Sequence, residues 1–252
     1  MKTYQQTIES MTMPFTIMIV SEPDSLSESR WHTTVTLIQT YLDHVDHLFS
    51  PFRSDSLVTQ YQRHSLAVTN FNAEFQEVFA LTVIAEEMTS GAFTANFSGQ
   101  YDPTGIVKGW AIERAFQTYL KPLLNTGAIA VALNGAGDIR VGALVDSGYE
   151  WPIGIEDPED TGQMLREIKI ANCAVATSGS SKRGDHIRRL DSANTLTQAT
   201  IIATNLIDAD MLATTAISMG QIPFQTFAET HKLNAILLTA AHKLIMIDGD
   251  QS

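Results

Sequence analysis

The chain has 252 residues, 44% of them hydrophobic, and a formal net charge of −12 at pH 7. This length and apolar content are enough to bury a substantial core, and no linker, low-complexity tract or internal repeat interrupts the pattern, so we expect a single domain over residues 1–252. The acidic balance argues against a non-specific nucleic-acid surface or a surface for anionic membranes, so no nucleic-acid partner is expected.

The predicted elements, in chain order, alternate between helical and extended patterns. Apolar periodicity predicts helices at about 26–48, 72–90, 107–124, 208–220 and 222–232. Alternating or continuous apolar runs predict strands at 14–20, 128–133, 139–145, 151–155, 168–177, 199–204, 234–238 and 244–247. Because several strands follow one another without a helix, as in 128–177, the fold class is predicted to be α+β, with mixed or antiparallel sheets packed with helices.

The N-terminus and the cysteine content bear on the compartment. The apolar run that begins near Met13 covers about seven residues, which is too short to cross a bilayer, and polar and acidic residues precede it, unlike in a signal peptide. Cys173 is the only cysteine, so no disulfide can form within the chain and a reducing compartment is favoured. We therefore expect a cytoplasmic protein with no membrane anchor in this chain.

The segment DPTGIVKGW, residues 102–110, brings an acid, a glycine turn and a lysine to the start of a helical pattern. Gly105 and the amides of the first turn would lie at a helix N-terminus, where exposed N–H groups and the helix dipole favour anions. Lys108, kept near solvent, would add a point charge. The segment alone is also typical of an ordinary turn and cap, which is the alternative.

A second segment, IDADMLATTAISMG at 207–220, places acids at another predicted helix start. Thr214 follows Asp210 by four residues, so that the carboxylate and the hydroxyl share one helical face. Hard oxygen ligands of this kind suit magnesium. The alternative is a capping Asp followed by a buried stripe that packs on a sheet.

Five ordered motifs resemble those of the ApbE family, namely DPTGIVKGWAIERA (102–115), NGAGDIRVG (134–142), WPIGIEDP (151–158), VATSGSSKRGDHI (175–187) and ADMLATTAISMG (209–220). This family comprises magnesium-dependent FAD:protein FMN transferases, formerly called thiamine biosynthesis lipoproteins. The resemblance runs from about residue 11 to about residue 220 and is greatest to the short, signal-less branch. It implies Mg2+ as cofactor, FAD as substrate and an acceptor flavoprotein with a Ser or Thr target.

The resemblance also implies a set of FAD contacts. Asp102 is expected to bond the flavin or its ribityl chain, and Lys108 to contact FAD. Met11 would lie against the flavin, with simple packing before a strand as its alternative. Phe52 would flank the flavin or the adenine, with a buried core position as its alternative.

Residues 90–97, SGAFTANF, resemble the family's GAFD element, whose backbone lines the cofactor pocket. Ala92 and Phe93 are expected to keep that backbone role. Thr94 replaces the usual Asp, which leaves the role of its side chain open.

The metal is implied to be held by Asp210, Thr214 and the backbone carbonyl of Gly105. Asp210 is then catalytic through the metal. His186 is either a catalytic base or flavin contact, or a loop histidine bonded to a backbone carbonyl, and Ile187 beside it is expected to contact the cofactor. The family pattern His-x-Ile-Asp-Pro is altered here to HIRRLD.

The implied reaction is attack by an acceptor Ser or Thr hydroxyl on the FMN-side phosphorus of FAD, with expulsion of AMP. Attack by water would instead make the chain an FAD pyrophosphatase. Two further classes of protein stay open, a non-catalytic flavin-binding protein and an interaction domain that binds no flavin.

Overall fold

One eight-stranded antiparallel sheet organises the chain, and it is accompanied by a separate two-stranded hairpin. The computed structural model describes residues 1–97, 99–160, 162–179 and 196–249. In spatial order the large sheet consists of β1 (Lys2–Ser10), β2 (Met13–Ser21), β3 (Ala128–Gly135), β4 (Asp138–Ala143), β7 (Ala174–Gly179), β8 (Leu196–Ala203), β9 (Asn234–Thr239) and β10 (Leu244–Ile247). The hairpin pairs β5 (Trp151–Glu156) with β6 (Met164–Ile170). The predicted α+β class is confirmed.

The helices described are α1 (Glu28–Phe49), α2 (Leu57–Gln62), α3 (Ala73–Met88), α4 (Thr104–Ala115), α5 (Leu206–Met219) and α6 (Gln221–Thr230). Four of them, α1, α2, α3 and α5, begin after a Ser or Asn whose side chain accepts the backbone N–H three residues on. Such caps satisfy an N–H group that the first helical turn leaves without a partner, and so they fix where each helix starts.

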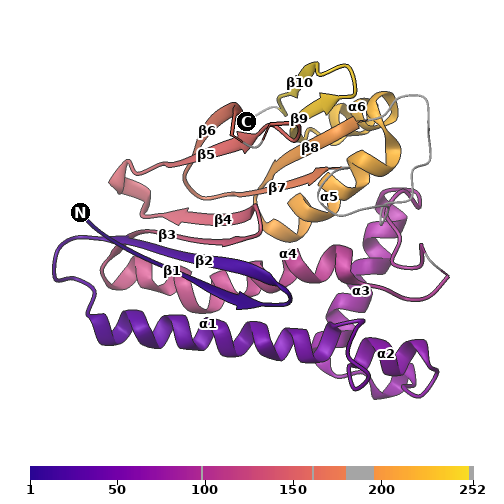
Figure 1. Ribbon diagram of the computed structural model, residues 1–252, viewed down its shortest axis with the longest axis horizontal. Coiled ribbons are helices and arrows are strands. Elements are labelled where there is room, and N and C mark those ends of the chain that lie inside the picture. The colour runs from indigo at the N-terminus through magenta and orange to yellow at the C-terminus, as the bar shows by residue number, and fades with distance from the viewer. Residues whose placement is uncertain (98, 161, 180–195, 250–252) are drawn as a thin grey trace.

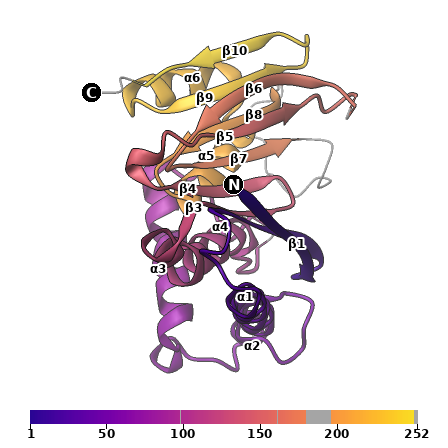
Figure 2. The ribbon, with the colours of Figure 1, turned by 90° about the vertical axis from the view of Figure 1, so that its left-hand side faces the viewer.

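The helices cover one face of the sheet (Figure 1). Apolar side chains of α1, α3, α4, α5 and α6 form the main core with inward side chains of the strands, such as Ile17, Leu133 and Ile201. On the opposite face, the β5–β6 hairpin packs over β3 and β4, where Trp151 joins Val141 and Ala132 in a smaller cluster. Figure 2 shows these layers from the side. The alternation of side chains along β3 supplies both cores, as a period of two requires.

The elements of the structure differ from the predicted ones in several places. The expected strand 168–177 is two strands, β6 and β7, which belong to different sheets. The helix expected from residue 107 begins at Thr104 and, after Ala115, continues as a π-helical turn and a 3-10 turn to Thr126. Strand β1 was not predicted, because it is a sheet edge with a mostly polar, exposed sequence in which few side chains, Tyr4 and Ile8 among them, are buried.

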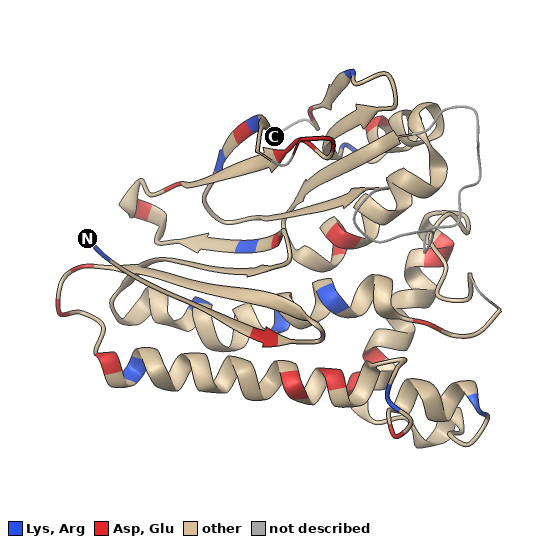
Figure 3. Cartoon of the chain, viewed as in Figure 1, with Lys and Arg blue, Asp and Glu red and all other residues tan. Residues whose placement is uncertain are grey.

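The charge distribution agrees with the acidic composition. In Figure 3, the Lys and Arg residues of the described part of the chain are spread over several helices and strands. Among the residues described, none of the helices combines the length and apolar character needed to cross a membrane.

Candidate functional site

The N-terminal half of α4 packs closely on the first turns of α5 at a glycine. A Cβ at Gly109 would lie 2.7 Å from the carbonyl oxygen of Leu206 and 3.0 Å from the Cβ of Asp210. The Gly109 N–H donates to Asp210 Oδ2 at 3.1 Å. Asp210 is therefore a buried residue of the helix contact, only 2% exposed, and the alternative that it caps α5 is wrong. That cap is Asn205, which accepts the N–H of Asp208 at 2.9 Å.

Lys108 is the buried cation of this contact. Its ammonium contacts Asp138 Oδ2 and lies 3.3 Å from Asp210 Oδ1, and the residue is only 4% exposed. The expectation that Lys108 stays near solvent is wrong, because two buried carboxylates hold it inside. Asp138 accepts the backbone N–H of Thr177 at 3.0 Å through its other oxygen. The Lys108 cluster, defined as Lys108, Asp138 and Asp210, thus joins α4, β4 and α5.

A second buried ion pair supports the same three elements. Arg140 Nε lies 3.2 and 3.0 Å from the two carboxylate oxygens of Glu113. Glu113 Oε2 also accepts the Leu206 N–H at 2.8 Å, in the first turn of α5. Sequence reasoning missed this pair, although charged residues set among apolar ones in the segments AIERA and DIRVG were a usable signal.

The predicted metal residues come from both helices of this contact, Gly105 from α4 and Asp210 and Thr214 from α5. Thr214 is one turn after Asp210 on α5, is partly exposed, and has its hydroxyl oxygen 3.4 Å from Ser178 Oγ on β7. The carbonyl of Gly105 is the usual helical acceptor for the N–H of Gly109, so it competes with Asp210 for that donor. Within the described part of the chain, no three or more His, Cys, Asp or Glu side chains form a group that could hold a metal.

Carboxylate, hydroxyl and carbonyl oxygens nevertheless fit magnesium. That ion is commonly held by one or two carboxylates and completes its coordination with water and substrate phosphates. The donor set of Asp210, Thr214 and Gly105 is consistent with this ligand chemistry.

The start of α4 is built by Asp102 and Phe93. Asp102 Oδ1 accepts the Thr104 N–H at 3.0 Å and also contacts the Thr104 hydroxyl, so it closes the turn before the helix. A Cβ at Gly105 would lie 3.1 Å from the ring of Phe93, which shows that this ring packs on the first helical turn. The side chain of Asp102 thus has a structural role in the described contacts, and its contact with FAD stays a prediction.

The segment after α3 is held by local hydrogen bonds. The Phe93 N–H donates to Thr89 Oγ1 at 3.0 Å. Thr94 donates to Glu86 Oε2 and accepts the Asn96 N–H, each at 3.1 Å. Thr94 is therefore part of a turn, while the backbone of Ala92 and Phe93 is fixed beside α4.

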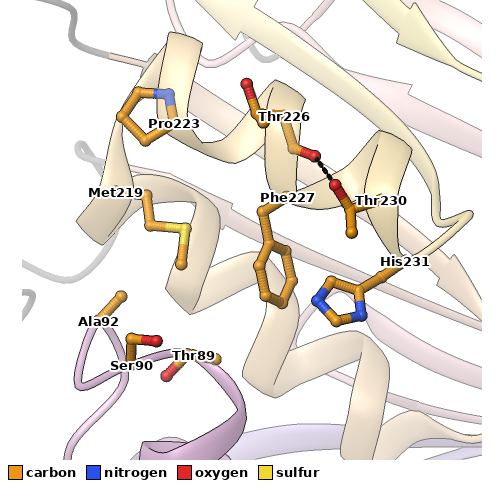
Figure 4. A pocket seen from close by; sticks show the side chains of 9 residues that line it. All are labelled: Thr89, Ser90, Ala92, Met219, Pro223, Thr226, Phe227, Thr230 and His231. Atoms are coloured by element: carbon orange, nitrogen blue, oxygen red, sulfur yellow. Dashed lines mark hydrogen bonds between the residues drawn. The ribbon is translucent and has the colours of Figure 1, made fainter.

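A pocket of about 400 Å3 opens between this segment and the end of α5 with α6 (Figure 4). Ala92 lines it together with Thr89 and Ser90, and the far side is formed by residues of α5 and α6. There, the rings of Phe227 and His231 lie 4.2 Å apart between centroids. The volume is within the range of small-molecule sites.

Of the four remaining predicted residues, two are described and two lie outside the described residues. Met11 and Thr12 have φ of 49° and 60° and form the two-residue turn between β1 and β2, where Met11 packs against the main core. Phe52, in the link between α1 and α2, is 89% exposed, so its alternative as a core residue is wrong. His186 and Ile187 lie outside the described residues. The flavin contacts of all four residues stay predictions.

The fold and the Lys108 cluster define an α+β protein whose candidate site lies where α4, β4 and α5 meet. Comparison with known proteins gives the family. The model of the ApbE family matches residues 96–237, which is more than half of the chain, so the chain belongs to the ApbE family. This confirms the resemblance carried by the five motifs.

A curated relative is the FAD:protein FMN transferase of Treponema pallidum (strain Nichols), which is 26% identical over 140 residues. The match covers 48% of this chain and only 38% of that protein. The matched region therefore spans well under half the length of that relative.

Solved structures share the fold over nearly the whole chain. A variant of the flavin transferase ApbE from Vibrio cholerae has a TM-score of 0.79 at 18% identity, with 99% of this chain and 98% of that chain covered. The apo flavinyl transferase ApbE of Pseudomonas stutzeri has a TM-score of 0.78 at 16% identity, with coverage of 97% and 95%. The ApbE protein of Thermotoga maritima has a TM-score of 0.78 at 18% identity, with 97% of each chain covered.

Proposed function

We propose that this chain transfers the FMN part of FAD to a Ser or Thr hydroxyl of an acceptor protein, with release of AMP, in a magnesium-dependent reaction. Membership of the ApbE family and the curated FAD:protein FMN transferase support the reaction class. The observation that carries the proposal is the buried contact of Lys108, Gly109 and Asp210, because it brings an ammonium and a carboxylate together beside the N-terminal half of α4, the helix that the motif predicts for phosphate binding.

The bonds of the proposed reaction balance without an oxidant or reductant. The acceptor oxygen forms a bond to the FMN-side phosphorus, the bond from that phosphorus to the oxygen of AMP breaks, and the hydroxyl proton passes to a base or to water. Phosphoryl-type transfer needs charge neutralisation and in-line positioning more than covalent help from the protein. We propose Asp210, Thr214 and the Gly105 carbonyl as the magnesium ligands, and the ion when bound would neutralise charge on the pyrophosphate.

The chain's own groups would do the positioning. The N-terminus of α4 carries the positive end of the helix dipole, which favours a phosphate. Phe93 packs on the first turn of this helix and Ala92 lines the neighbouring pocket, so we assign this pocket to a ring system of FAD. Its apolar lining suits a planar aromatic group.

Asp102 would support the same site by keeping the turn before α4 closed. Met11, Phe52, Thr94 and Ile187 stay proposed FAD contacts, and His186 a proposed base. We also propose a cytoplasmic location, on the basis of the single cysteine.

The test measures AMP by chromatography after the purified chain is incubated with FAD and a candidate acceptor flavoprotein, with either Mg2+ or EDTA. We expect AMP with Mg2+ and none with EDTA, and a flavin that stays on the denatured acceptor. AMP together with free FMN would identify a pyrophosphatase instead. FAD binding with no AMP would identify a non-catalytic flavin-binding protein.

A further inference from the structure

The Lys108 cluster places a positive charge beside one of the proposed metal ligands. Lys108 lies 3.3 Å from the very carboxylate, Asp210, that is proposed to bind a divalent cation. An ammonium and a metal ion repel each other and compete for the same anionic oxygens, and burial removes most screening by salt. A third group must offset the lysine if Asp210 is to hold a metal.

Asp138 is placed to offset the positive charge of Lys108. Its Oδ2 contacts the ammonium of Lys108 directly, while its Oδ1 accepts the Thr177 N–H at 3.0 Å. The bond to β7 fixes the carboxylate, and both Asp138 and Lys108 are buried. Taken by themselves, the two carboxylates and the ammonium of the Lys108 cluster sum to a charge of −1, which favours a further cation.

We infer that Asp138 is a positioning residue of the proposed metal site, which binds the ammonium of Lys108 and thereby leaves the carboxylate of Asp210 able to hold a divalent cation. The inference rests on the proposed function, because it concerns the same cation. Asp138 acts through Lys108 and is not itself a metal ligand in this account. Gly109 complements it by fixing the second oxygen of Asp210 with its N–H.

The test measures Mn2+ binding to the purified full-length chain by electron paramagnetic resonance of free Mn2+, first without FAD and then with FAD added. Asp138→Asn keeps an oxygen that can accept the Thr177 N–H but removes the charge that holds Lys108. We expect Mn2+ affinity to fall by on the order of tenfold. Lys108→Met should raise Mn2+ affinity by about the same factor, since it removes the competing cation.

The double variant, which carries both Asp138→Asn and Lys108→Met, gives the sharper result. Its cluster has the same net charge as in the unmodified chain. Adding Lys108→Met to Asp138→Asn should therefore return the Mn2+ affinity to within about threefold of the unmodified value. A merely structural role for Asp138 predicts no such rescue, because the double variant lacks both partners of the buried pair.

Glu77→Gln is the matched control. It makes the same carboxylate-to-amide change at the half-exposed pair of Glu77 with Arg114, which links α3 to α4. Mn2+ affinity should stay within about twofold of the unmodified chain, because exposed pairs are weak and screened. Thermal melting of every variant shows whether it is folded.

Each outcome decides something. A folded Asp138→Asn protein with unchanged Mn2+ affinity overturns the inference and leaves the proposed function standing. If Asp138→Asn does not fold, Lys108→Met decides, since equal or weaker Mn2+ affinity in that variant overturns the inference too. Failure of the unmodified chain to bind Mn2+, with and without FAD, would overturn both the inference and the proposed metal site.

Discussion

Gly109 offers a test of how closely activity depends on the contact between α4 and α5. The change is Gly109→Ala, whose added Cβ would lie 2.7 Å from the Leu206 carbonyl oxygen, where ordinary contact begins at 3.4 Å. The new Cβ would therefore be 0.7 Å too close, which is 3.4 minus 2.7. Because the atom that it meets belongs to the backbone, one of the two helices must shift. Because Asp210 is carried on the shifted helix, its carboxylate moves relative to Lys108 and to the start of α4.

The Gly109→Ala change is expected to lower activity more than stability. Overpacking costs about 1–3 kcal/mol, while Ala in place of Gly in a helix regains about 1 kcal/mol. The free energy of unfolding should therefore fall by only about 0–2 kcal/mol. A displacement of under an ångström at a reacting centre can lower the rate by about tenfold to a hundredfold, so AMP release should suffer more than stability.

The assay is AMP release from FAD with Mg2+, read beside urea unfolding. Gly142→Ala is the control, since its Cβ would meet the Phe116 ring at 2.9 Å on a different part of the sheet. That variant should lose some stability and keep its activity. Full AMP release by the Gly109→Ala protein would refute the reasoning that the close helix contact sets the geometry of the site.

Four further outcomes are expected. Asp210→Asn should lower magnesium-dependent AMP release by at least about a hundredfold, because the proposed metal loses its anionic ligand, and wild-type release in a folded variant would show that the carboxylate is structural. Lys108→Met should lower the free energy of unfolding in EDTA by about 3–5 kcal/mol, since it leaves buried carboxylates without their cation, and urea unfolding with an unchanged midpoint would contradict this. Phe52→Ala should change the free energy of unfolding by less than about 0.5 kcal/mol, because the ring is exposed. It should nevertheless weaken FAD binding by roughly 0.5–1.5 kcal/mol in calorimetry, and equal FAD affinity would remove Phe52 from the site. Burial raises the pKa of the Cys173 thiol, so less thiolate forms at pH 8. Alkylation of Cys173 by iodoacetamide should therefore be slower in the folded chain than in the urea-unfolded chain, whereas equal rates would show an accessible thiol.

Periodicity was enough to predict the α+β class and most elements, because the strands and helices of the core carry apolar residues at the spacing that their geometry requires. It failed where tertiary context decides. Strand β1 is polar yet ordered by pairing with β2 along its whole length. The run 168–177 reads as one strand, but its two halves join different sheets.

The site was predictable in part. Asp210 and Thr214 could be placed on one helical face from their spacing alone, and the motifs placed Gly105 at the start of α4. The burial of Lys108 could not be predicted, because it depends on how β4 and α5 come to lie beside α4. Asp138 stands in the motif NGAGDIRVG, and nothing local indicated that its carboxylate reaches a lysine on another element.

The measurement that tests the central claim most directly is intact-protein mass spectrometry of a candidate acceptor flavoprotein, after incubation with this chain, FAD and Mg2+. The account predicts a mass increment of one FMN on a Ser or Thr of the acceptor, an equal amount of AMP, and neither product in EDTA or with Asp210→Asn. An acceptor that a known flavin transferase modifies under the same conditions, but that gains no mass with this folded and FAD-bound chain, would contradict it.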